Sequence, residues 1–264
     1  MNILCPTDFT PAADIALARA THLAAKGGAS ITLLHVLDRG EVKNGGLAEA
    51  SARMDQSAQE AMRAVKVHEI FREGDTMKQI AAETSNGTYN IMVAGTHGVR
   101  GIRQSLLGAD MLKLVRHVGI PSLVVQANTP PHATIQRIVM PVAGHDDIGG
   151  LLDDVCYLAG LDDAEVLIYQ LDRPGEAPSD RLLENKRRML ARLTAKGIRH
   201  REVHEPSTVY SAGFAAATIA FAKKENADLI AIMAQASAEY SYIADADKER
   251  LLANDAGIPV LCAV

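Results

Sequence analysis

Tryptophan is absent from the sequence, and aromatic residues make up only 4% of it. The hydrophobic core must therefore be aliphatic. No apolar run approaches the roughly 18 residues that a membrane-spanning helix needs. The chain starts directly with a short apolar strand, without the charged and long apolar segments of a signal peptide. We therefore expect no membrane partner.

Cysteine is also scarce. The three cysteines, Cys5, Cys156 and Cys262, lie far apart within apolar segments. An odd number without paired spacing argues against a disulfide framework and favours a reducing compartment. We therefore expect a cytoplasmic protein.

Positive charge shows no excess. The sequence has 27 Lys and Arg against 32 Asp and Glu, which gives a net charge of −5. No basic stripe indicates nucleic acid as a partner. With 48% hydrophobic and 22% charged residues, the composition is that of a globular protein. The 264 residues suffice for one large domain or for two of about 130 residues.

The first half of the chain alternates between apolar strand patterns and helical patterns. Residue 10 is a plausible N-cap, because Thr10 precedes Pro11 at the start of an amphipathic segment. Such alternation implies right-handed crossovers and a parallel sheet. We expect strands at residues 2–7, 29–37, 65–72, 90–94 and 121–126, and helices at residues 11–26, 47–64, 75–85 and 108–117, with a polar loop at residues 38–46.

The second half repeats the first. The apolar-proline strand at residues 2–7 returns at 137–142, and Gly119-Ile120-Pro121 returns as Gly257-Ile258-Pro259. The offset between the copies rises from about 135 to 138 residues, which indicates a duplication. Residues 128–134 contain two consecutive prolines and form the obvious linker. We predict a first domain at residues 1–127, a linker at 128–135 and a second domain at 136–264.

A glycine-rich loop follows the fourth expected strand. Glycines stand at positions 95, 98, 101 and 108, and a helix is expected to begin at Gly108. Glycine lets a ligand approach the backbone, and free N–H groups at a helix start bind anions. Arg100 and Arg103 add positive charge. This stretch therefore predicts a phosphate-binding loop.

The spacing of Gly95, Gly98 and Gly108 resembles the nucleotide motif of the universal stress protein family. Pro6-Thr7-Asp8 after the first strand and Gly119-Ile120-Pro121 before the last strand strengthen the resemblance, which extends over both halves. It implies an α/β protein of two tandem Rossmann-like (adenine nucleotide alpha hydrolase-like) domains. Each would contain a five-stranded parallel sheet in 3-2-1-4-5 order. It also implies an adenine nucleotide, above all ATP and with or without Mg²⁺, as ligand, and a role in stress survival.

The resemblance also implies a set of site residues near the point where the strand order reverses. The family acid at the position of Asp8 contacts the nucleoside, and Val36 and Ala94 would line the adenine pocket. The plainer alternatives remain: Asp8 as an acid near a helix dipole, Val36 and Ala94 as core residues, and the loop glycines as turn formers. The full set is Pro6, Thr7, Asp8, Val36, Ala94, Gly95, Thr96, His97, Gly98, Arg100, Gly108, Ala109 and Asp110.

Two of these positions depart from the family pattern. The family has Ser or Thr after the last glycine, where this chain has Ala109. A lost hydrogen bond to a charged group costs about 1.5–3 kcal/mol, or about tenfold to a hundredfold in affinity. Asp110 suits the helix dipole but would repel a nearby phosphate, unless Mg²⁺ or an arginine intervenes or its side chain points away. Weak ATP binding, or a preference for a smaller adenylate, is consistent with these residues.

The second half lacks the motif. Pro141-Val142-Ala143 replaces Pro6-Thr7-Asp8, and the loop at residues 234–242 has no glycine and carries Glu239. We expect at most one nucleotide site per chain.

Catalytic and metal sites are not expected. The sequence has no P-loop pattern and no clear base in the glycine loop. His200 and His204 alone are weak indications of a metal site, and we assign residues 145–147 to helix capping.

Two alternatives to nucleotide binding stay open: an interaction protein with an empty pocket and, less favoured, a slow ATPase. The strands at 121–126 and 259–264 could pair within one molecule as a pseudo-dimer, which would satisfy edge strands. A homodimer of chains is a further option.

Overall fold

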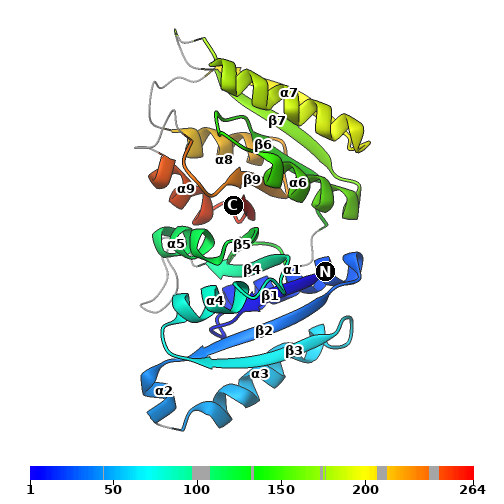
Figure 1. The fold of residues 1–264 in the computed structure, drawn as a ribbon. Coiled ribbons are helices and arrows are strands. Elements are labelled where there is room, and N and C mark those ends of the chain that lie inside the picture. The colour runs from blue at the N-terminus through cyan, green and yellow to red at the C-terminus, as the bar shows by residue number, and fades with distance from the viewer. Residues whose placement is uncertain are drawn as a thin grey trace.

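The fold is an α/β structure around one ten-stranded sheet, shown by a computed structural model (Figure 1). It describes residues 1–43, 45–96, 108–131, 134–172, 175, 177–206, 213–237 and 244–264. The first half contains β1 (Asn2–Pro6), α1 (Pro11–Gly27), β2 (Ser30–Leu37), α2 (Arg39–Lys43), α3 (Leu47–Ala61), β3 (Val67–Glu73), α4 (Thr76–Thr84), β4 (Ile91–Thr96), α5 (Gly108–Val118) and β5 (Ser122–Gln126). The second half contains β6 (Arg137–Pro141), α6 (Gly149–Asp162), β7 (Glu165–Asp172), α7 (Asp180–Ala195), β8 (His200–Pro206), α8 (Phe214–Lys224), β9 (Leu229–Met233), α9 (Ala244–Leu252) and β10 (Val260–Ala263).

The strand order confirms the predicted fold class. It runs β3-β2-β1-β4-β5-β10-β9-β6-β7-β8, so each half is a five-stranded sheet in 3-2-1-4-5 order. All pairs within a half are parallel. The two halves meet where β5 and β10 pair antiparallel, with Val124 opposite Val260. The sheet therefore continues from one half into the other.

The core lies on both faces of this sheet and is mainly aliphatic, as the composition predicts, with a buried aromatic pair, Tyr169 stacked on Phe221. One cluster packs helices α1, α3, α6 and α7 against one face, and a second packs α4, α5, α8 and α9 against the other. Each half thus contributes helices to both layers. No helix among the described residues is long and apolar enough to cross a membrane.

Helix α1 begins at the residue that the local sequence predicts and ends one residue later than predicted. The Thr10 side chain accepts a hydrogen bond from the Ala13 N–H at 3.4 Å, and Pro11 occupies the first helical position. Gly28, with φ of 63°, ends the helix in the left-handed conformation. One local prediction was wrong in part, because residues 39–43 of the expected polar loop form the short helix α2. Its first turn is supported by Asp38, whose Oδ1 accepts a hydrogen bond from the Gly40 N–H.

All three cysteines are free and buried. Burial, with Asp14 as a smaller cause, raises the pKa of Cys5 to about 12, and burial raises that of Cys262 to the same value. We therefore expect both thiols to react slowly with Ellman's reagent in the native protein, because the thiolate is the reactive form. Cys156, which retains slight exposure, should react first, and three thiols should react in guanidinium. Immediate reaction of all three in the native state would contradict this burial.

Candidate functional site

The strand order of the first half reverses at β1, which lies between β2 and β4. Ligands of open α/β sheets bind in the crevice beyond the carboxyl ends of the strands at such a point. Pro6 ends β1, Asp8 follows it, and Gly95 and Thr96 end the neighbouring strand β4. The structure thus brings these sequence-predicted residues to the same edge of the sheet.

The loop after β1 is held by hydrogen bonds. The N–H of Thr7 donates to the Leu34 carbonyl at 2.8 Å, and the Thr7 carbonyl lies 2.8 Å from His35 Nδ1. The exposed carboxylate of Asp8 accepts hydrogen bonds from Thr10 through Oδ1, from the N–H at 3.1 Å and from the hydroxyl at 2.6 Å. Asp8 therefore supports the N-cap of α1, and these contacts use only one of its two oxygens.

Phe9, which follows Asp8, also lies in the site region, although no sequence pattern singled it out. Its φ of 59° is rare for a residue that is not glycine and marks a constrained backbone. The Phe9 ring lies 4.4 Å from the His35 ring and 4.4 Å from the Arg53 guanidinium carbon. The two contacts join residues 26 and 44 positions apart in the chain, so no local sequence signal could have predicted them.

Gly95 has a packing role that is visible only in the fold. A Cβ built on Gly95 would lie 2.8 Å from the Ala13 nitrogen, and closer still to the carbonyl carbon and oxygen of Ala12. Helix α1 therefore begins directly against β4. The glycine at this position brings the amino end of α1 to the crevice, whether or not a ligand also approaches it.

Val36 and Ala94 are almost fully buried and belong to the cluster on the α4 and α5 face. Thr96 is fully buried at the end of β4. This burial agrees with the alternative that Val36 and Ala94 are ordinary core residues. If they contact a ligand, they do so through backbone groups.

Helix α5 begins at Gly108, so Gly108, Ala109 and Asp110 lie in its first turn. Asp110 is half exposed, and its Oδ1 is 3.6 Å from the Lys113 ammonium. His97, Gly98, Gly101, Arg100 and Arg103 lie outside the described residues.

Carboxylates lie at the starts of both helices that border the crevice, each with a cation nearby. Burial raises the pKa of Asp14 in the first turn of α1, the charge of Asp8 raises it further, and Arg53 partly opposes both. Asp110 adds another carboxylate at the start of α5.

The corresponding edge of the second half is occupied by protein groups. Asn185 donates from Nδ2 to the carbonyls of Ala143 and His145, both at 2.8 Å. The Lys248 ammonium is buried at the end of β9, bonded to the carbonyl of Ala234 at 3.2 Å and to that of Gln235. Burial lowers the pKa of Lys248 to about 8, with help from the charge of Arg116.

His145 and Asp147 lie in the segment that follows strand β6, as Ala143 does. Burial, with the charge of Lys248, lowers the pKa of His145 to about 4, so this imidazole is neutral near pH 7. The Asp147 carboxylate accepts a hydrogen bond from the Gly149 N–H at 2.9 Å, where α6 begins. Asp147 thus supports the start of α6 from the residue before the N-cap, Ile148, which makes no side-chain capping hydrogen bond itself.

Metal-binding groups do not cluster among the described residues. His200 Nδ1 lies 2.7 Å from the Ile198 carbonyl, and His204 Nδ1 lies 3.3 Å from Asp172. Each histidine thus has its own neighbouring acceptor.

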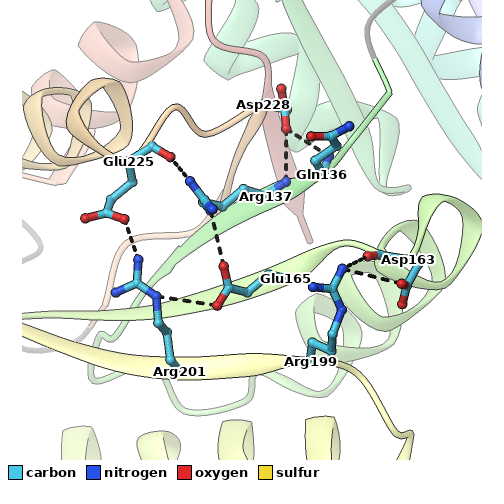
Figure 2. Close-up of polar contacts among 8 residues, drawn as sticks. All are labelled: Gln136, Arg137, Asp163, Glu165, Arg199, Arg201, Glu225 and Asp228. Carbon is cyan, nitrogen blue, oxygen red and sulfur yellow. Dashed lines mark hydrogen bonds and ion pairs between the residues drawn. The ribbon is translucent and has the colours of Figure 1, made fainter.

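Three arginines of the second half, Arg137, Arg199 and Arg201, form ion pairs at the amino ends of β6, β7 and β8 (Figure 2). Glu165 lies 3.2 Å from Arg137 and 3.4 Å from Arg201, and Arg201 also contacts Glu225. Arg199 pairs with Asp163 at 3.4 Å. This positive charge is therefore neutralised by neighbouring carboxylates. The backbone N–H groups of Gln136 and Arg137 donate to Asp228, which completes the network.

Residues 1–126 match the model of the Universal stress protein family. The first half is therefore a domain of the universal stress protein family, as its motif predicts. The sequence has no significant match among curated proteins.

Solved structures of similar fold extend over the whole chain. A universal stress protein from Archaeoglobus fulgidus DSM 4304 is 16% identical, with a TM-score of 0.72 over 99% of this chain and 95% of that chain. A putative universal stress protein from Pseudomonas aeruginosa UCBPP-PA14 is 18% identical, with a TM-score of 0.61 over 99% and 92%. At these identities the similarity establishes the tandem fold and nothing about ligands.

Proposed function

We propose that the first half binds one adenine nucleotide in the crevice between the ends of β1 and β4. The observation that carries the proposal is the position of Asp8, which follows β1 at the point where the strand order reverses. The motif in which Asp8 lies belongs to a domain that matches the universal stress protein family. A role in the response to stress rests on this family membership alone.

The nucleotide would contact groups from three segments. Asp8 offers a carboxylate oxygen to the ribose, and the backbone near Val36 and Ala94 offers hydrogen bonds to the base. The first turn of α5 from Gly108 offers N–H groups to the phosphates. Pro6, Thr7, Gly95 and Thr96 shape the walls, and His97, Gly98 and Arg100 complete the proposed loop.

The acidic residues favour a magnesium complex of ATP, or an adenylate with fewer charges. Asp8 and Asp110 supply oxygen ligands of the kind that Mg²⁺ accepts. Ala109 has no hydroxyl to donate to a phosphate, so we expect modest affinity.

The second half contributes no nucleotide site in this proposal. Lys248 and Asn185 already bind the carbonyls that border its crevice. We further propose that the halves act as domains 1–127 and 136–264, joined by a linker at 128–135. The β5–β10 pair then makes one chain a pseudo-dimer.

Isothermal titration of ATP and AMP, each with Mg²⁺, into the wild type and Gly108→Val tests the proposal. We expect micromolar binding with about one site per chain, lost in Gly108→Val because the added side chain would obstruct the phosphate loop. The absence of heat with both ligands would favour the alternative of an interaction protein with an empty pocket. Phosphate release from ATP that is lost in Asp8→Ala would instead favour a slow ATPase.

A further inference from the structure

Helix α5 connects the proposed site to the second half of the molecule. Its amino end at Gly108 lies in the proposed phosphate loop, and Arg116 lies in its last turn. Eight residues of helix separate the two positions, or about 12 Å at 1.5 Å per residue. A side chain at Arg116 is therefore too distant to touch a phosphate bound at Gly108.

Arg116 binds the second half through all three of its nitrogens. Nε donates to the Ala234 carbonyl at 3.0 Å, at the end of β9. Nη1 and Nη2 donate to the two oxygens of Asp245 at 3.0 and 2.5 Å. The hydrogen bond to Asp245 raises the pKa of Arg116, and the same bond lowers the pKa of Asp245. A forked pair of this kind fixes orientation as well as distance.

Apolar contacts also join α5 and α9. Leu112 and Val115 of α5 are buried in the same apolar cluster as Leu251 and Leu252 of α9. Close packing of these side chains sets the spacing of the two helices, and the forked pair of Arg116 adds a directional contact at the last turn of α5. Lys248 also binds the Ala234 carbonyl, which holds the acceptor of Arg116 in place.

We propose that Arg116 is a positioning residue for the nucleotide site, because it anchors α5 to the second half and so orients the helix start toward the phosphates. The inference rests on the proposed function and deepens it. It gives the second half, whose own crevice edge is bound by Asn185 and Lys248, a role in the site of the first half.

The test compares ATP with adenosine, since only ATP has phosphates for the start of α5. We expect Arg116→Met to bind ATP with Mg²⁺ about tenfold more weakly in calorimetry, with adenosine affinity within about twofold of the wild type. The matched control is Arg192→Met, which removes an Arg–Asp pair between α7 and α6 inside the second half. The control should leave both affinities unchanged.

Exchanging the charges of Arg116 and Asp245 tests whether the ion pair itself supports ATP binding. Arg116→Asp combined with Asp245→Arg should bind ATP better than Arg116→Asp alone, because the ion pair is restored in the reverse sense. Wild-type ATP affinity in Arg116→Met, or an equal loss of ATP and adenosine affinity, would overturn the positioning role. A wild type that binds neither ligand would overturn the proposed function itself.

Discussion

Gly95→Ala is expected to lower the free energy of unfolding by about 3 kcal/mol, at the upper end of overpacking effects in well-packed cores. The new Cβ would meet the backbone of Ala12 and Ala13 at the start of α1, where no flexible side chain can move aside. Helix α1 or strand β4 must shift to admit it. Because Asp8 and Thr10 are tied to the same helix start, nucleotide affinity should also fall.

Urea unfolding followed by circular dichroism measures this effect, with Gly160→Ala as the matched control. Gly160 lies within α6, and a Cβ there meets no atom within 4 Å. Alanine at a helical glycine should raise stability by about 0.5–1 kcal/mol. Equal stability of Gly95→Ala and the wild type would refute the close approach of α1 and β4.

The second large effect concerns Asp162, at the end of α6, whose side chain is only 2% exposed. Its Oδ2 lies 2.9 Å from His22 Nε2 and accepts a hydrogen bond from the Ile135 N–H at 2.9 Å, while Oδ1 lies 3.2 Å from Lys26. The carboxylate thus joins α1 of the first half to Ile135 and to α6 of the second half. We expect Asp162→Asn to cost about 2–3 kcal/mol, because hydrogen bonds to a charged group are among the strongest.

The carboxyl group of Asp162 should also make the stability of the fold depend on pH. Burial alone would raise its pKa, but the hydrogen bonds from Ile135, His22 and Lys26 outweigh burial and hold the pKa below the usual value of an aspartate. A lowered pKa stabilises the fold above the unfolded-state value near 4, and this contribution is lost as the pH falls through the folded-state value. The stability difference between the wild type and Asp162→Asn should therefore shrink in acid.

Chemical unfolding at pH 7 and at several acidic values tests both statements. Asp163→Asn is the control, because Asp163 is exposed and asparagine tolerates its left-handed backbone. Its cost should stay within about 1 kcal/mol, the range of surface ion pairs. Equal costs for the two neighbouring substitutions would exclude Asp162 as a link between the halves.

The sequence predicted the features that depend on local order. The alternation of strand and helix patterns predicted the strands. Thr10 and Pro11 predicted the start of α1, and the repeated Gly-Ile-Pro segment indicated the duplication. Contacts between distant segments carry no local signal. The approach of Ala12 to Gly95 and the tilted ring contact of Phe9 with His35 are visible only in the folded chain.

The candidate site likewise has residues that the sequence predicted and contacts that it did not. The sequence identified Asp8 and the start of α5, which the structure places after β1 and before the return to β5. It did not reveal that Lys248 binds the carbonyls after β9 or that Arg116 reaches Ala234, because both depend on how α5 and α9 pack.

The most direct test of a single first-half site is the mapping of ATP-induced amide shifts by nuclear magnetic resonance on the labelled full chain. The account predicts saturable shifts at Asp8, Val36 and Ala94 and their neighbours, with Val142 and Ile232 at the second crevice unmoved. Shifts centred on Val142 and Ile232, or no saturable shift at Asp8, would contradict it.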